Sequence, residues 1–133
     1  MKKAFSLLEL IFAIVVLGII SSFAIPKYLD TRDSAVVSTI KRDIATITNS
    51  LQTYHLINHK IDLISNALTI NQSNWKLEDK KVTFLEGKEE CIILSIIKIN
   101  SLDVINLTID PKAGKICDKL SSEGIIARTY ELY

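Results

Sequence analysis

The sequence predicts an α+β fold in which one long amino-terminal helix packs on a small antiparallel β-sheet. Three observations support this prediction. An apolar run occupies most of the first 26 residues, an apolar stripe with helical spacing follows it, and segments with strand periodicity occupy the second half. The chain has 133 residues, 48% of them hydrophobic. The portion beyond the apolar run therefore has room for one small domain of roughly 100 residues.

The first predicted element is an apolar helix. The chain begins MKKAFSLLELIFAIVVLGIISSFAIP, where two lysines precede an apolar run that a single acid, Glu9, interrupts. The 17 residues from Leu10 to Pro26 carry no formal charge. As a helix rising about 1.5 Å per residue they cover roughly 26 Å, close to the roughly 30 Å of a hydrocarbon core. Residues 5–26 are therefore predicted to span a membrane.

Glu9 needs a physical explanation in such a helix. An ionised side chain in hydrocarbon costs roughly 2.5 to 3.5 kcal/mol, so this carboxylate either has a partner or lies hydrated among lipid headgroups. An acid at this position, together with a helical pattern that continues through Pro26, disfavours an ordinary secretory signal peptide. Lys2 and Lys3 predict that the amino end stays cytoplasmic and that the chain after Pro26 lies on the far side of the membrane.

The helix is predicted to continue beyond Pro26 as an amphipathic segment over about 27–58. Pro26 removes a backbone donor and crowds the carbonyl of Ser22, which predicts a kink and not an end of the helix. Apolar residues then recur at intervals of 3, 4, 3, 4 and 3 positions: Val37, Ile40, Ile44, Ile47, Leu51 and Tyr54. This stripe is predicted to pack against the domain's own sheet, with coiled-coil pairing to another chain as the alternative.

Two histidines lie near the end of this helix. His55 and His59 are four positions apart, a spacing that can present two imidazoles to one metal ion on a helix. No third ligand follows at a characteristic interval, and Asn58 suggests that the helix is ending. We therefore interpret both as ordinary exposed histidines and predict no metal site.

The second half predicts a short helix and then an antiparallel meander of three or four strands. The short helix and a polar connection fall within Lys60–Asn74, and Gly124–Tyr133 reads either as a final strand or as a flexible end. Asp110–Gly114 suits a type I turn with a left-handed residue closing a hairpin. The other turns are Glu86-Gly87-Lys88 and Asn100-Ser101, and the predicted strands are Lys81–Leu85, Cys91–Ile99 and Val104–Asp110.

Cys91 and Cys117 are the only cysteines, and both fall in regions where we expect strands. If the chain after Pro26 is exported, they lie in an oxidising compartment and should form a disulfide. Closing that loop would contribute roughly 3.5 kcal/mol in the chain-entropy model. A redox-active pair and two buried free thiols are the alternatives, and the absence of C-x-x-C spacing disfavours the first.

Charge and motif content argue against several classes of function. The net charge is +1, and loss of Lys2 and Lys3 would leave 14 basic and 15 acidic side chains, so no direct binding of nucleic acid is predicted. Lys76–Lys81 and Glu86–Glu90 mix both signs and are interpreted as solvated turns. The sequence has no Gly-rich phosphate loop, no G-x-S-x-G elbow and no H-E-x-x-H motif. We therefore predict neither an enzyme nor a bound cofactor.

The amino-terminal residues resemble those of the type IV pilin and pseudopilin family, which includes subunits of type II secretion and DNA-uptake machines. The resemblance rests on Phe5-Ser6-Leu7-Leu8-Glu9-Leu10, on the small residue Ala4 before it, and on Pro26. It implies that residues 1–4 are a leader, that a prepilin peptidase cuts between Ala4 and Phe5, and that the new amino group of Phe5 is methylated. Ala4 is a departure, because glycine is the usual residue before the cut.

The resemblance also implies a pilin-like fold and a structural role. The protein would be held in the inner membrane by residues 5–26, with 27–133 as a periplasmic domain, until an assembly platform extracts it to polymerise with itself and other pilins. Glu9 of one subunit would then meet the Phe5 amino group of a neighbour and fix the axial register of the helices. We expect a type II secretion pseudopilin. The alternatives are a type IV pilus or DNA-uptake pilin, and a membrane-tethered binding module or enzyme.

Overall fold

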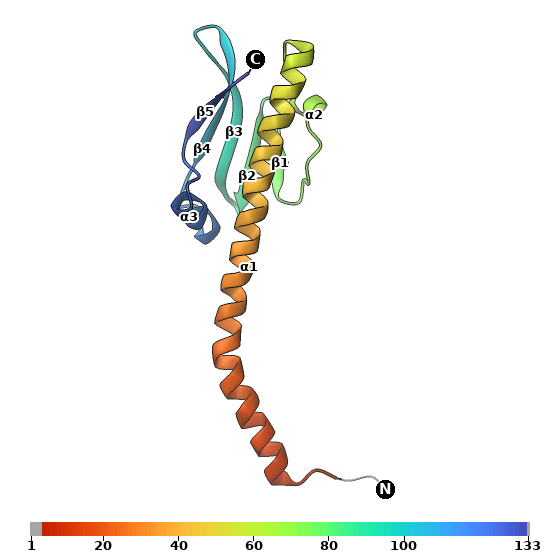
Figure 1. The fold of residues 1–133 in the computed structure, drawn as a ribbon, viewed down its shortest axis with the longest axis vertical. Coiled ribbons are helices and arrows are strands. Elements are labelled where there is room, and N and C mark those ends of the chain that lie inside the picture. Colours follow the sequence, from red (N-terminus) through yellow and green to blue (C-terminus); the bar gives the residue numbers. More distant parts are fainter. Residues whose placement is uncertain (1–3, 133) are drawn as a thin grey trace. The chain divides into compact units, whose positions relative to one another are not determined.

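The computed structural model describes residues 4–132 and confirms the predicted α+β fold (Figure 1). A long helix, α1, is followed by two short helices and five strands. The chain divides into two compact units, Met1–Ala35 and Val36–Tyr133, which are described separately below. The elements in chain order are α1 (Leu7–Asn58), α2 (Ile64–Ala67), β1 (Trp75–Leu77), β2 (Lys81–Glu86), β3 (Glu89–Ile99), β4 (Leu102–Ile109), α3 (Lys115–Ser122) and β5 (Arg128–Glu131).

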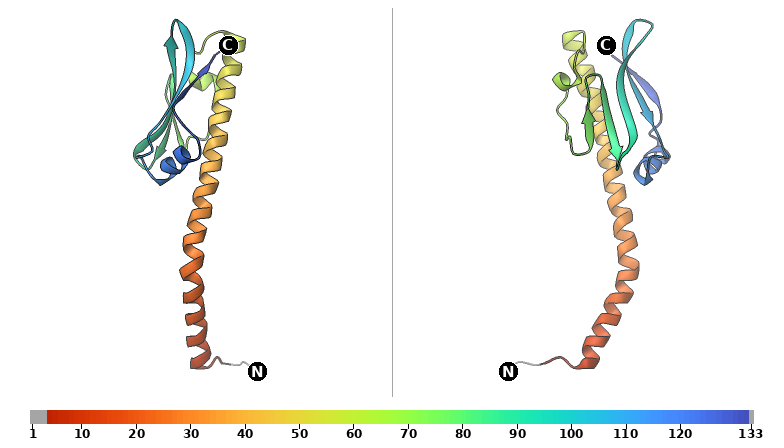
Figure 2. Two further views of the ribbon diagram at one scale, coloured as in Figure 1. Left: turned by 60° about the vertical axis from the view of Figure 1, so that its left-hand side comes forward. Right: turned by 180° about the vertical axis from the view of Figure 1, so that it is seen from behind.

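The apolar stripe of α1 packs into the core of the second unit, as predicted. Its members from Val37 to Leu51 are buried, and Tyr54 is half-buried against the same core. The sheet supplies the other side of this core through Val82, Ile92, Leu94, Ile105 and Leu107, all at most 1% exposed. Both views in Figure 2 place the sheet beside the carboxyl-terminal part of α1. The stripe therefore belongs to the fold of the chain itself and is not free for a coiled coil.

The sheet is a five-stranded antiparallel meander in the order β1-β2-β3-β4-β5. The three predicted strands are confirmed as β2, β3 and β4. The last segment resolves as a strand, β5, which pairs with β4 from Val104↔Glu131 to Leu107↔Arg128. The added first strand, β1, is only three residues long. Trp75 begins it, is buried, and donates its indole N–H to Asp43 of α1 at 2.9 Å.

The predicted Asn100-Ser101 turn is confirmed as the two-residue connection between β3 and β4. Both residues have positive φ, 50° and 68°. This is the type I′ pattern, whose twist matches that of the paired strands. The predicted short helix is confirmed as α2, and Ile61, Ile64 and Leu68 around it are buried in the core.

The prediction for the segment after Asp110 is partly wrong. The turn exists, since Ala113 N–H bonds the Asp110 carbonyl at 3.1 Å, but a helix, α3, follows it where we expected a strand. Gly114 is extended, with φ 173°, and not left-handed. Cys117 accordingly lies on a helix. The physical reason is that Cys117 and Leu120 are buried one helical turn apart on a single face of α3.

Candidate assembly site

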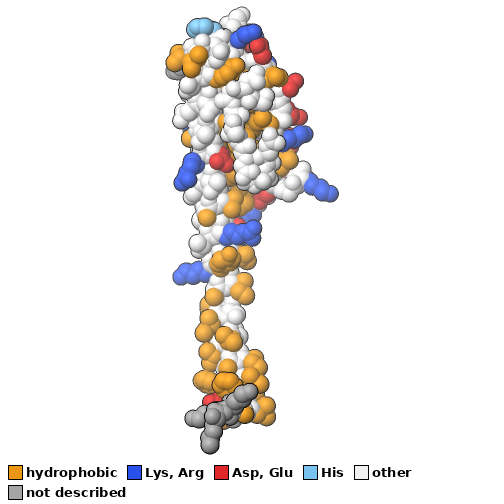
Figure 3. Space-filling view, turned by 90° about the vertical axis from the view of Figure 1, so that its right-hand side faces the viewer, with side chains coloured by type: hydrophobic (Ala, Val, Ile, Leu, Met, Phe, Trp, Pro, Cys, Tyr) orange, Lys and Arg blue, Asp and Glu red, His pale blue; other side chains and the backbone are white. Residues whose placement is uncertain are grey.

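The first unit of the chain exposes an apolar helix surface. Almost every large side chain from Leu7 to Ile25 is at least half exposed, among them Phe12 at 70% and Phe23 at 75%. Figure 3 shows hydrophobic side chains covering this part of α1. Among the described helices, α1 alone has the length and composition to cross a membrane, with a mean hydropathy of 2.6 over an 18-residue window that is not buried. Such a surface requires lipid or other apolar helices as its surroundings.

Ser6 and Glu9 form a reciprocal capping box at the start of this helix. Ser6 precedes the first helical residue, and its Oγ accepts the Glu9 N–H at 3.2 Å. The Glu9 carboxylate accepts the Ser6 N–H at 3.1 Å and also lies 3.2 Å from Ser6 Oγ. Two otherwise unpaired backbone donors of the first turn are satisfied in this way, and the acid lies at the positive end of the helix dipole.

This capping box gives Glu9 a partner that the sequence interpretation missed. The signal was present, because Ser-x-x-Glu before an apolar run is the signature of a capped helix start. Glu9 is exposed and its partners come from its own helix turn. In a single chain the Glu9 carboxylate is therefore hydrogen-bonded within its own helix turn, and it remains accessible from outside the helix.

The remaining predicted site residues of this unit flank the helix or lie within it. Ala4 and Phe5 precede α1, and the Phe5 side chain is 84% exposed. Lys2 and Lys3, on which the predicted orientation depends, lie outside the described residues, as does most of the predicted leader. Pro26 lies inside α1, and the helix continues through it as predicted. Ser22, whose carbonyl loses a partner to Pro26, donates its own hydroxyl to the Ile19 carbonyl at 2.7 Å.

In the second unit, Cys91 of β3 and Cys117 of α3 form the predicted disulfide. Their Cα atoms are 5.8 Å apart, well within the range of disulfides. Both residues are at most 1% exposed. The bond links the sheet to α3, so the predicted pairing is confirmed while its predicted strand-to-strand geometry is wrong.

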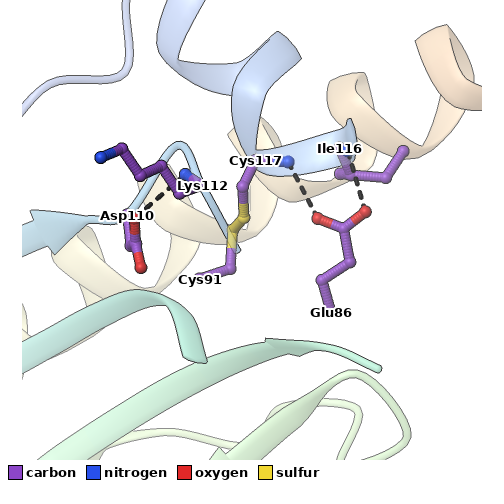
Figure 4. Close-up of a disulfide and its surroundings, with 6 residues drawn as sticks. All are labelled: Glu86, Cys91, Asp110, Lys112, Ile116 and Cys117. Atoms are coloured by element: carbon purple, nitrogen blue, oxygen red, sulfur yellow. Dashed lines mark hydrogen bonds between the residues drawn. A yellow bond between two sulfur atoms is a disulfide. The ribbon is translucent and has the colours of Figure 1, made fainter. Parts of the chain in front are cut away.

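Glu86 caps α3 next to this disulfide (Figure 4). Its two carboxylate oxygens accept the backbone N–H groups of Ile116 at 2.9 Å and Cys117 at 3.0 Å. Interpreting Glu86 as part of a solvated turn was therefore wrong. Glu86 and the two sulfurs lie close enough together to resemble a metal cluster. The sulfurs, however, are bonded to each other and the carboxylate to amide donors, so the cluster is structural.

His55 and His59 do not share a helix face. His55 lies in the last turn of α1, whereas His59 follows the end of the helix in a left-handed conformation, with φ 60°. The helical spacing that could have presented both imidazoles to one ion therefore stops at Asn58.

Comparison with known proteins finds matches to the amino-terminal part of the chain. A family profile described as a prokaryotic N-terminal methylation motif matches residues 1–25. Type II secretion system core protein G of Escherichia coli (strain K12) is 31% identical over 58 residues, which are 44% of this chain and 40% of that protein. The proteins of the same name from Vibrio cholerae and Pseudomonas aeruginosa are 37% and 33% identical over 57 residues each, 43% of this chain and 39% and 40% of those proteins.

The chain thus matches about two fifths of the length of these relatives. No solved structure matches it with significance. The residues matched by the family profile include Ala4, Phe5 and Glu9, on which the resemblance rests, and the long helix with an antiparallel sheet agrees with a pilin-like fold. In its N-terminal methylation motif and in its similarity to secretion core proteins, the amino-terminal part of the chain resembles the type IV pilin and pseudopilin family.

Proposed function

We propose that this protein is a pseudopilin of the type II secretion kind, a structural subunit that polymerises into a filament through its amino-terminal helix. The observation that carries the proposal is the exposed apolar helix with an accessible carboxylate, Glu9, in its first turn. A membrane can cover this surface before assembly, and the same surfaces of neighbouring helices can cover it afterwards. The similarity to type II secretion core proteins supports this kind of filament over a type IV pilus or a DNA-uptake pilus.

Processing prepares the helix for this role. We propose that a prepilin peptidase cuts between Ala4 and Phe5 and that the new Phe5 amino group is methylated. Both residues precede α1 and are exposed, so the bond lies outside regular structure. A methylated amine keeps its positive charge. In the filament it meets Glu9 of a neighbour, and each charge offsets the other inside an apolar bundle.

The proposal also includes a location in the cell. Residues 5–26 hold the subunit in the inner membrane with the amino end cytoplasmic, and residues 27–133 form a periplasmic domain. An assembly platform in that membrane extracts the subunit, which then joins copies of itself and other pilins. The proposed role is structural, and the features that support it in the described chain are a helix cap, a disulfide and a packed core.

Replacing Glu9 tests the proposal. Glu9→Leu keeps an apolar helix in the membrane but removes the charge that sets the axial register, so we expect normal membrane levels and loss of incorporation into sedimentable filaments. Leu8→Ile, one position away and also exposed, is the matched control and should assemble normally. A membrane-tethered binding module or enzyme would tolerate Glu9→Leu, so unchanged incorporation or function would contradict the proposal.

A further inference from the structure

The β3–β4 hairpin extends beyond the rest of the sheet (Figure 1). Pairing of β2 with β3 ends at Lys81↔Ser95, and pairing of β5 with β4 ends at Glu131↔Val104. From Ile97 to Asp103 the two strands pair only with each other. We call this segment the ribbon.

The two faces of the ribbon differ in chemistry. Ile97 pairs with Val104 and Ile99 with Leu102, and because side chains alternate along a strand these pairs share one face. On the opposite face Lys98 pairs with Asp103, with 3.6 Å between Nζ and Oδ1. The two charged side chains on this face therefore pair with each other. The apolar face stays open, with Ile99 42% and Leu102 68% exposed.

A groove runs from the ribbon to the end of β5. It has a volume of about 380 Å³, and its apolar lining includes Ile99, Leu102, Val104 and Leu132. Two acidic residues also line it: Asp103, whose carboxylate is paired with Lys98, and Glu131. Within the described chain no ion pair involves Glu131. The groove therefore suits an apolar side chain accompanied by a cation.

An exposed apolar side chain and a cation lie close together in sequence at the other end of β5. Ile126, just before β5, is 54% exposed, and Arg128 at the start of β5 is also exposed. The Arg128 guanidinium lies 5.9 Å from the centre of the Tyr130 ring, and the described residues give it no carboxylate partner. One end of β5 thus carries an apolar groove with an acid, Glu131, and the other an apolar side chain with a base.

We propose that the groove of one copy binds the Ile126–Arg128 segment of a second copy, with Ile126 against Leu102 and Arg128 beside Glu131. The charges are complementary, and the two surfaces differ, so the contact is head-to-tail. Repeated head-to-tail contacts leave a free surface at each end and generate an open chain of subunits. This inference rests on the proposed filament and adds a head-domain contact to the helix contacts.

Cysteine cross-linking of full-length protein in its native membrane tests the pairing. The native cysteines are bonded to each other, so a short bismaleimide reports only introduced thiols. Co-expression of Leu102→Cys with Ile126→Cys should give a cross-linked dimer, and the double variant in one chain should give a ladder of multimers. Each single variant alone should give neither product. Leu56→Cys, similarly exposed at 61%, is the control and should not cross-link to Ile126→Cys.

Charge reversal tests the recognition. Glu131→Arg and Arg128→Glu should each reduce the cross-linked yield by at least about fivefold, because close charge pairs at interfaces couple this strongly. The combined variant Glu131→Arg with Arg128→Glu should restore the yield. Loss in both single variants without restoration would show that the charges do not face each other and would contradict the proposed contact.

Filament content measured by sedimentation of the same samples separates this inference from the proposed function. Filaments that form without the Leu102–Ile126 cross-link overturn the head-to-tail contact and leave the pseudopilin proposal intact. A dimer formed by Leu102→Cys alone indicates a symmetric contact between two ribbons and also overturns it. Absence of any filament from the unmodified chain contradicts the proposed function, and this inference with it.

Discussion

A single side chain, Glu86, gives α3 its beginning. Gly114 occupies the N-cap position of this helix and has no side chain with which to cap it. The Glu86 carboxylate takes that role from the end of β2 by accepting two backbone N–H groups. A Cβ at position 114 would overlap this carboxyl group, so a larger residue there would have to displace the Glu86 cap. The reason for glycine at this position is close approach and not backbone conformation.

Removing the cap should destabilise the second unit. Glu86→Ala leaves two N–H groups of α3 without partners, and we expect a loss of about 1 to 2 kcal/mol in the free energy of unfolding. Denaturant unfolding of the full chain in detergent micelles measures it. Glu89→Ala, an exposed acid in the next strand, is the control and should change stability by less than about 0.5 kcal/mol. Equal effects of the two variants would refute the capping role.

The disulfide between Cys91 and Cys117 also stabilises the fold, because it restricts the conformations of the unfolded chain. Replacing Cys91 and Cys117 together by serine should cost about 3 kcal/mol. The thermal midpoint should fall by several degrees, with roughly 4 to 8 °C per kcal/mol as an upper guide for a small domain. Peptide mapping without reductant identifies the bond directly. Two alkylatable thiols in protein isolated from the periplasmic face would contradict either the pairing or the proposed orientation.

At the scale of elements, the turn between β1 and β2 is held by charges on the surface. The Glu78 carboxylate lies 3.2 Å from Lys81 Nζ through its Oε2 atom and 3.5 Å from Lys76 Nζ through its Oε1 atom. The hydrogen bond from Lys81 lowers the pKa of the Glu78 carboxyl below its usual range, partly opposed by desolvation and aided by the charges of both lysines. Because the folded-state pKa is lowered, the interaction stabilises the turn above the ordinary pKa of glutamate. It is lost as the pH falls through the lowered value.

This turn provides a prediction that can be measured residue by residue. Lys81→Met should raise the pKa of Glu78 toward its ordinary value, since it removes the largest cause of the shift. Lys76→Met should raise the same pKa by less. Carboxyl-detected NMR titration of the full chain in micelles measures both variants. An unchanged Glu78 pKa in Lys81→Met would mean that the ion pair does not persist in solution.

The prediction at the scale of the whole molecule concerns processing of the amino terminus. We predict that the mature protein begins at Phe5 with a methylated amino group, because the motif residues Ala4, Phe5 and Glu9 stand at the expected positions. Intact-mass analysis of protein from its native membrane should show loss of residues 1–4 and addition of about 14 Da, the mass of one methyl group in place of hydrogen. Retention of Met1–Ala4, or a cut after Ala24, would contradict this processing.

Much of the fold could be predicted because its signals are local. A run of uncharged residues marks the apolar helix, and the interval pattern from Val37 to Tyr54 marks the face that packs on the sheet. Alternation and turn residues placed β2, β3, β4 and the Asn100-Ser101 turn. The Ser6-x-x-Glu9 cap is equally local and could also have been predicted from the sequence.

What the sequence alone determined was the amino-terminal helix, its apolar stripe and the meander, since each depends on residues close together in the chain. Only the tertiary structure determined that Lys115–Ser122 forms a helix and not a strand. Its N-terminal cap is Glu86, 30 residues before the Ile116 amide that it binds, and its apolar face needs Cys91 and the core to be buried. A short helix without a cap in its own sequence is marginal in water, so distant contacts determined its structure.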